Sequence, residues 1–157
     1  MTALMLAAAV AATNLTATLP TIVVEASRLG REPMAMAQHV ETIDENAIAA
    51  SDAKNLPDLV SRLPGLNLYH LGAGNPALAQ IQMRGYGENG FGRVLVSMDG
   101  ENLNNFDMYW PNTARIPLGG VRKIEVLHGP QTVLHGDAAS AGMINVVTDP
   151  GDYSEKT

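Results

Sequence analysis

Four short β-type runs between residues 80 and 148 limit most strongly how this chain can fold. They are rich in Ile, Val, Leu and Met, and glycine, proline or an Asp-Gly step stands between them. Runs of this length, interrupted in this way, are typical of strands joined by turns and loops. The sequence therefore predicts a small, compact sheet with strands at 80–84, 93–98, 122–127 and 143–148.

The residues before these runs predict two more strands and two helices. A strand at 38–43 leads to Asp44, whose side chain can cap a helix that continues to residue 50. A second helix begins at a capping-box-like pair and ends at Pro64-Gly65, and a strand at 67–71 follows it. The apolar residues of this second helix recur at helical spacing: Leu56, Leu59, Val60 and Leu63.

Two further local signals complete the expected structure. Asp99-Gly100 predicts a tight turn after the strand at 93–98, and a short helix is expected at 131–135, between a proline and Gly136. Short helices mixed with strands point to an α+β fold with a small mixed β-sheet. A chain of 157 residues suits a single domain.

Composition excludes several classes of function. The chain has no Cys, so disulfides and thiolate metal sites are excluded. Its 16 acidic and 10 basic residues give a net charge of −6 without a basic run, so we expect no nucleic acid partner. We find no nucleophile or carboxylate pair arranged for chemistry, so an enzyme is not expected. The histidines show no metal-ligand spacing, so no metal and no cofactor are expected: His39, His70, His128 and His135.

The glycines at 85, 87 and 90 fit the G-x-G-x-x-G pattern of dinucleotide-binding proteins. That pattern binds a pyrophosphate only where it leaves a strand and opens a helix. Here a β-rich run follows at 93–98. We therefore interpret these glycines as a tight loop between two strands.

The N-terminal residues 1–19 predict a signal peptide. An apolar run at 3–12 is followed by small residues, and ten residues span only about half of a bilayer core. No Lys or Arg precedes the run, so a truncated start remains the alternative. Residues 20–37 show no helical period and predict a flexible arm around the β-branched run 21–24.

The order of these segments resembles the plug domain of TonB-dependent outer-membrane receptors. The resemblance rests on Ile81-Gln82-Met83-Arg84-Gly85, the Asp99-Gly100 turn, the run from Lys123 to Pro130, and Gly142 to Thr148, preceded by a helix and a Pro-Gly turn. It implies a plug domain at 38–148, and a tail at 149–157 where a barrel would begin. The stretch 67–104 is similar to cobalamin receptors in particular.

A segment of the arm resembles a TonB box, the short extended stretch that the periplasmic domain of TonB grips. An extended β-branched segment can add to an exposed sheet edge. The pattern alone favours a strand of this domain's own sheet, and the resemblance reverses that preference. The resemblance implies that the TonB-binding residues are Thr21, Ile22, Val23, Val24, Glu25 and Ala26.

Two loops, at 69–78 and 104–113, are the candidates for contact with a ligand. If consecutive strands alternate in direction, both loops emerge at the same end of the sheet. The second loop combines aromatic, amide and carboxylate groups, which can stack on and hydrogen-bond a small molecule. A hydrophobic cluster under a long loop is the alternative. The ligand-facing residues implied are His70, Asn75, Asn105, Asp107, Tyr109 and Trp110.

The resemblance also implies two positions that hold a plug inside its barrel. Arg84 matches the first, whereas the second carries His128 where the family has an arginine. A neutral imidazole cannot make a bidentate guanidinium contact, so this part of the lock departs from the family pattern. The alternative for Arg84 is an ordinary surface or cross-strand ion pair with Glu125.

These observations lead to one functional hypothesis and one alternative. The resemblance implies a plug in the cell outer membrane that gates energy-coupled uptake of a metal–siderophore chelate, a cobalamin or a similar nutrient. Its partners would be the TonB periplasmic domain, a β-barrel and the small-molecule nutrient. The alternative is a free-standing periplasmic binding or adaptor protein that has the plug fold without transport activity.

Overall fold

The computed structural model describes residues 24, 26, 38–70, 79–90, 92–105, 111, 113 and 116–149. The predicted signal peptide at 1–19 lies outside this part of the chain. The strands are β1 (Val40–Asp44), β2 (Leu66–His70), β3 (Ala79–Met83), β4 (Val94–Met98), β5 (Glu101–Asn102), β6 (Val121–His128) and β7 (Gly142–Thr148). The helices are α1 (Glu45–Ala50), α2 (Leu56–Val60) and α3 (Thr132–His135), with 3₁₀ turns η4 (Gly87–Gly90) and η6 (Asp137–Ala139).

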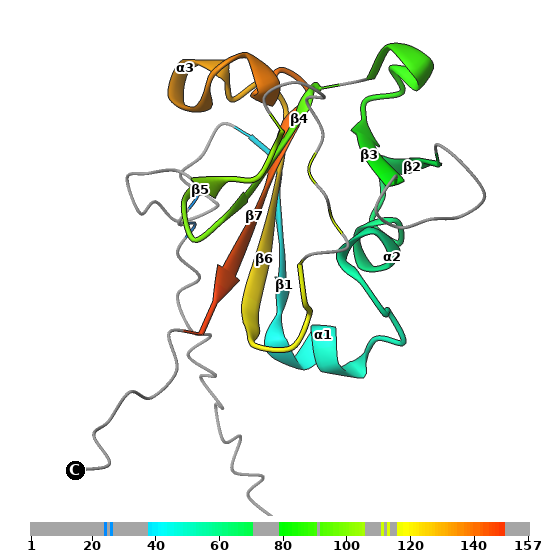
Figure 1. Ribbon diagram of the computed structural model, residues 1–157, viewed down its shortest axis with the longest axis vertical. Helices are drawn as coiled ribbons and strands as arrows, with labels where there is room; N and C mark the ends of the chain where they lie inside the picture. The colour runs from blue at the N-terminus through cyan, green and yellow to red at the C-terminus, as the bar shows by residue number, and fades with distance from the viewer. Residues whose placement is uncertain are drawn as a thin grey trace, which may run out of the picture.

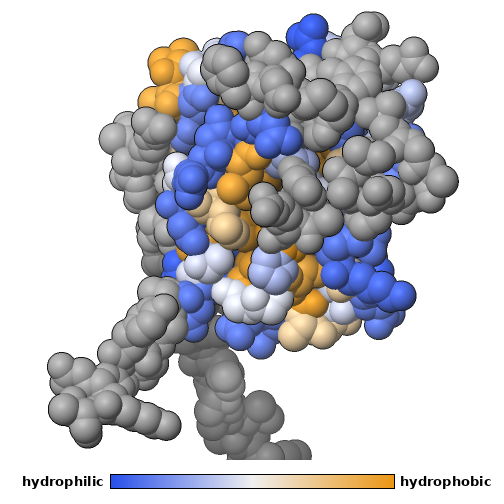
Figure 2. Space-filling view, viewed as in Figure 1, coloured by the Kyte–Doolittle hydropathy of each residue, from blue (hydrophilic) through white to orange (hydrophobic). Residues whose placement is uncertain are grey.

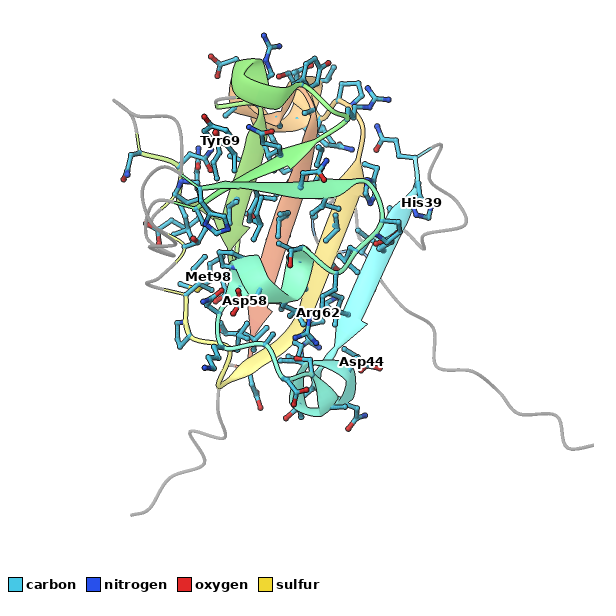
Figure 3. The ribbon with its side chains drawn as sticks, turned by 90° about the vertical axis from the view of Figure 1, so that its right-hand side faces the viewer. His39, Asp44, Asp58, Arg62, Tyr69 and Met98 are labelled. Atoms are coloured by element: carbon cyan, nitrogen blue, oxygen red, sulfur yellow. The ribbon has the colours of Figure 1, made fainter. Side chains whose placement is uncertain are left out.

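Five strands form one mixed sheet in the order β1-β6-β7-β4-β5 (Figure 1). The pair β4–β7 is parallel, and the other neighbouring pairs are antiparallel. Strands β2 and β3 form a separate antiparallel hairpin. The α+β class and the mixed sheet with short helices are therefore confirmed. The hairpin lies across the face of the larger sheet (Figure 3).

Local capping chemistry explains where the first two helices begin. The Asp44 side chain accepts a hydrogen bond from Ala47 N at 2.8 Å, and the Asn55 side chain accepts one from Asp58 N at 2.9 Å. Each bond satisfies a backbone donor that the first helical turn leaves without a partner. Helix α2 ends at Val60, earlier than predicted, because a residue that precedes proline, here Leu63, disfavours helical conformation.

The Asp99-Gly100 turn forms as predicted. Both residues have positive φ, 51° and 85°, which is the requirement of a two-residue type I′ hairpin turn. The turn joins β4 to β5. The Asp99 carboxylate also accepts hydrogen bonds from the backbone N and the hydroxyl of Thr148, at 2.8 and 2.7 Å. These bonds connect the hairpin to the end of β7.

One face of the sheet, which we call the core face, carries the larger hydrophobic cluster. Helix α2 and the β2–β3 hairpin cover it (Figures 1 and 3). Packing is tight at Gly142, where a Cβ would lie 2.2 Å from Met83 Sδ and 2.7 Å from Leu127 O. The cluster combines buried residues of the core face with residues of α2 and β3 that cover it, and includes Leu56, Val60, Ile81, Val96, Ile124, Val126, Ile144 and Val146.

The opposite face, which we call the arm face, buries two residues of the N-terminal arm. Val24 is 0% exposed and Ala26 is 4% exposed. They pack with Leu95, Leu127 and Met143, and with two alanines of η6. The flexible arm at 20–37 stays a prediction, of which the structure describes these two residues. The parallel strands β4 and β7 are apolar on both faces, and such strands require cover on both sides.

Helix α3 presents the most exposed large apolar side chains of the described residues. Val133 is 96% exposed and Leu134 is 41% exposed. Figure 2 shows a hydrophobic projection where α3 lies in Figure 1. None of the helices in the described ranges is long and apolar enough to cross a membrane.

Candidate functional site

A row of polar side chains crosses the otherwise apolar arm face. Glu125 on β6 is fully buried and lies opposite Asn145 on β7, which in turn lies beside Ser97 on β4. Asn145 Nδ2 donates to Glu125 Oε2 at 3.1 Å, and Ser97 Oγ donates to Asn145 Oδ1 at 2.8 Å. Hydrogen bonds in such a row polarise one another at low dielectric. The row therefore connects three neighbouring strands.

Lys123 supplies the charge that balances the buried carboxylate. Its Nζ lies 2.9 Å from Glu125 Oε1, and its side chain is 13% exposed. A buried carboxylate without a cation or hydrogen-bond donors would be costly. This pairing corrects the suggestion of a surface pair between Arg84 and Glu125. Arg84 is exposed after β3, in the other sheet, whereas Glu125 is enclosed under the arm.

The same carboxylate holds the arm. Ala26 N donates to Glu125 Oε2 at 2.9 Å, and His135 Nε2 lies 2.9 Å from Ala26 O, to which it can donate. Both backbone groups of one arm residue are thus bound, one by β6 and one by the last residue of α3. Because these contacts use the backbone, they fix the position of the arm without depending on the side chain at position 26.

The free energy of these two hydrogen bonds is small enough for the arm to be released. A hydrogen bond to a charged group contributes about 1.5–3 kcal/mol, and a neutral one about 0.5–1.5 kcal/mol. The two bonds on Ala26 therefore contribute roughly 2–4 kcal/mol. That is enough to favour the docked arm and small compared with the free energy that a binding partner can supply.

A groove of about 460 Å³ lies beside the docked residue. Its volume falls in the range of small-molecule and peptide sites. The groove runs over the arm face of β4 and β7, and its lining contains both apolar and polar side chains. Its lining includes Leu95, Ser97, Asn102, Met143, Asn145 and Val147, together with Ala26 and His135.

Only part of the predicted TonB-binding segment can be placed. Val24 and Ala26 lie on the arm face, and Thr21, Ile22, Val23 and Glu25 lie outside the described residues. Sequence reasoning missed Asn145 and His135 entirely. A signal was present, because Asn145 is a polar residue within an apolar strand run and Glu125 stands between Ile124 and Val126. A buried polar residue inside a strand is informative in a way that a buried apolar one is not.

The predicted ligand-facing residues are only partly described. His70 at the end of β2 and Asn105 after β5 are both exposed. Asn75, Asp107, Tyr109 and Trp110 lie outside the described residues, so their meeting at one end of the sheet stays a prediction.

The neighbouring Asn104 has a structural role in the second loop. Its side chain accepts from Val96 N at 2.8 Å and donates to Val94 O at 3.0 Å. An isolated bridge between Asn104 and Pro111 closes the base of the loop. The loop is therefore anchored to the backbone of β4.

The two predicted lock residues lie on the core-face side of the molecule. Arg84 is exposed and has a positive φ of 64°. His128, the last residue of β6, is partly buried beside Glu41 and His39. Burial lowers the pKa of His128 below its ordinary value, and the fields of His39 and Arg84 act in the same direction against the carboxylate of Glu41. The ring is therefore neutral near pH 7.

The glycine-rich segment is a loop between strands, as predicted. Residues 87–90 form the 3₁₀ turn η4, and β4 follows it. No helix of eight or more residues begins within the described chain at this point, so the geometry that a dinucleotide pyrophosphate requires is not formed there.

The mixed sheet with its short helices matches the fold of a family of receptor domains. Residues 32–143 match the family model described as the TonB-dependent Receptor Plug Domain, and the chain belongs to this family.

Individual relatives agree with this assignment. The chain is 32% identical over 135 residues to the vitamin B12 transporter BtuB of Vibrio vulnificus (strain CMCP6), covering 86% of this chain and 22% of the relative. The crystal structure of the ferric yersiniabactin uptake receptor FyuA from Yersinia pestis superposes with a TM-score of 0.59 at 26% identity, over 76% of this chain and 18% of that one. For the siderophore receptor PirA from Acinetobacter baumannii the TM-score is 0.55 at 27% identity, over 70% and 17%.

The chain thus spans about a fifth of the length of the curated relatives it matches, 22% in the comparison with BtuB. These relatives are transporters and receptors. The expectation that the chain is not an enzyme is therefore confirmed.

Proposed function

We propose that this chain is the plug of an outer-membrane receptor that takes up a metal–siderophore chelate, a cobalamin or a similar nutrient. The observation that carries the proposal is the hold on Ala26, whose N–H and C=O are bound by Glu125 and His135. A plug that passes its arm to TonB requires an arm that is docked in one state and released in another. A backbone hold worth a few kcal/mol meets this requirement.

The choice of nutrient class rests on the relatives. BtuB is named as a vitamin B12 transporter, and PirA and FyuA are named as siderophore or ferric yersiniabactin receptors. Cobalamin and ferric siderophores are both metal chelates with large polar surfaces. The exposed polar residues His70 and Asn105, with the aromatic residues predicted in the second loop, are suited to stack on and hydrogen-bond such a ligand.

A continuous set of contacts gives ligand occupancy a route to the arm. Asn104, at the base of the second loop, is bonded to the backbone of β4 through Val94 and Val96. Ser97 follows on that strand and begins the polar row that ends at Ala26. We propose that ligand binding biases this row.

The partner that receives the arm would be the periplasmic domain of TonB. An extended peptide binds such a partner by adding a strand, which uses the backbone donors of the arm. The docked and TonB-bound arms would then compete for the same donors. The arm would have to leave Glu125 before the periplasmic domain of TonB could bind it.

Titration of the full chain with a TonB periplasmic domain tests this function. Val23→Pro should abolish binding, because proline removes a donor from the added strand. Glu125→Ala should bind up to roughly 10–150-fold more tightly, because the hydrogen bond that opposes undocking is lost. Val133→Ser, on exposed α3, is the matched control and should bind like the unchanged chain. Equal affinity for the chain and its Val23→Pro variant would contradict the proposed role of the arm.

A further inference from the structure

A second polar cluster lies away from the arm, at the edge of the sheet. His39 precedes β1, Glu41 lies within β1, and His128 ends β6 (Figure 3 labels His39). The register pairs Val40 with Leu127, and His128 N donates to His39 O at 3.0 Å, so the two histidines lie opposite each other. Glu41 is two residues beyond His39, and therefore on the same face of the strand. Antiparallel pairing brings all three side chains to one place.

The distances between the three groups are short. His39 Nε2 lies 3.1 Å from Glu41 Oε1, and His128 Nε2 lies 3.9 Å from Glu41 Oε2. The centroids of the two imidazole rings are 5.1 Å apart. One ligand atom from each residue can be chosen so that all three lie within 4.8 Å of one another.

Two of these atoms are buried and lack a hydrogen-bond partner among the described residues. They are Glu41 Oε2 and His128 Nε2, and their separation of 3.9 Å is too long for a hydrogen bond. Buried polar atoms nearly always have a partner, so such a pair requires an explanation. In tetrahedral geometry, two bonds of about 2.0–2.1 Å to a shared zinc ion hold their ligand atoms roughly 3.4 Å apart, so the two side chains would approach by about 0.5 Å when an ion binds. An ion between the two atoms would satisfy both.

We propose that His39, Glu41 and His128 bind a divalent transition-metal ion of the Zn²⁺ class. Two imidazole nitrogens and one carboxylate oxygen form a ligand set that zinc prefers, and that magnesium and calcium do not. His39 is the exposed member, with 68% of its side chain accessible, so it can turn to complete the site. The fourth position of a tetrahedral ion would face solvent.

The fold positions this set of two imidazoles and one carboxylate. Both buried ligands are positioned by β1 and β6, so little ordering is needed when an ion binds. Arg84 is the cation whose field reaches His128. Its positive charge opposes an added cation, so Arg84→Gln should strengthen binding.

No metal was expected from the sequence, because the spacing of the histidines matches no metal-ligand pattern. The site depends on the register between β1 and β6, which the sequence does not show. Glu41 and His128 lie 87 residues apart along the chain. His39 lies two residues after the arm at 20–37. A bound ion would therefore fix the first residues of β1 to the end of β6, whether or not the arm binds TonB.

Optical titration of the untagged full chain with Co²⁺, followed by displacement with Zn²⁺, tests the proposal. We expect one ion per chain and the intense visible absorption of a four-coordinate cobalt site. Loss of an outer-shell partner typically costs about 10–100-fold in metal affinity, so loss of a ligand should cost roughly 100-fold or more. This loss is expected for His39→Ala, Glu41→Gln and His128→Gln. The matched control is His70→Ala, which removes an exposed histidine of the other sheet and should bind normally.

A measurement on the unchanged chain guards against variants that do not fold. Nuclear magnetic resonance of the imidazole nitrogens should show that one equivalent of Zn²⁺ shifts signals of His39 and His128, and leaves those of His70 and His135 in place. Either of two results would overturn the proposal: no stoichiometric binding, or equal Zn²⁺ affinity in all three ligand variants and in the His70→Ala control.

Discussion

The two faces of the five-stranded sheet use the same strands for different purposes. On the core face, Ile124, Val126 and Ile144 are completely buried under a helix and a hairpin. On the arm face, the intervening positions of the same strands hold Glu125 and Asn145. Glu125 accepts a hydrogen bond from Ala26 N of the arm, and Asn145 donates to Glu125. Alternation of side chains along each strand allows this division.

The comparison teaches how a small domain can stay folded while part of it is released. Apolar burial contributes about 25 cal/mol per Å² and has no preferred direction, so it holds α2 and the hairpin firmly. A few hydrogen bonds to a buried carboxylate are directional and are lost together when the arm moves by a few ångströms. The core face therefore contributes most of the stability of the domain, and the contacts on the arm face allow the arm to be released.

The largest expected effect is on the core face. Ile144→Ala should lower the free energy of unfolding by about 2–5 kcal/mol, because it leaves a cavity in a fully buried site. Urea denaturation followed by circular dichroism measures the change. A loss below about 1 kcal/mol would show that this face does not carry the stability of the domain.

A second core-face variant adds volume rather than removing it. Gly142→Ala should lower the free energy of unfolding by about 1–3 kcal/mol, because its Cβ would meet the carbonyl oxygen of Leu127, which is backbone and cannot turn away. Gly119→Ala is the matched control, since a Cβ there meets nothing within 4 Å. Equal stability of the two variants would disprove the close contact at Gly142.

The arm face is tested with a thiol reporter, because the chain has no cysteine of its own. Val24→Cys places a single thiol at a fully buried arm position. Adding Glu125→Ala should raise its labelling rate by roughly 10–150-fold, the equivalent of one hydrogen bond to a charged group. Val133→Cys on exposed α3 should react at one rate in both backgrounds. An unchanged rate at position 24 would mean that Glu125 does not hold the arm.

A smaller effect is expected on the other side of Ala26. His135→Ala removes the donor to Ala26 O and should raise labelling of Val24→Cys by roughly 2–12-fold, the equivalent of a neutral hydrogen bond. The ordering of the two variants sharpens the comparison. A larger effect for His135→Ala than for Glu125→Ala would show that α3, and not β6, makes the stronger contact with the arm.

Much of the fold was predictable because its signals are local. Asp44 and Asn55 each cap a helix by accepting from the backbone N–H three residues further on, and Asp99-Gly100 forms a turn within two residues. The strands at 93–98 and 143–148 lie within one residue of β4 and β7. Such features depend on residues close in sequence, where side-chain type and backbone preference are directly coupled.

The candidate site was much less predictable because its signals are not local. Ala26 and Glu125 are 99 residues apart, and only the folded sheet brings them together. The same reason explains the surface pair wrongly suggested for Arg84 and Glu125, which assumed that a charged strand residue faces solvent. An apolar neighbourhood on both sides of Glu125, in Ile124 and Val126, was the one available warning.

Native-state hydrogen exchange of the unchanged full chain tests the central claim most directly. The account predicts that the Ala26 amide opens with a free energy well below that of Val126 and Ile144, and that low urea leaves the Ala26 value unchanged, as expected for local release. If all three amides open with the same free energy and the same urea dependence, the arm leaves only when the sheet unfolds. That result would contradict a releasable arm on a stable sheet.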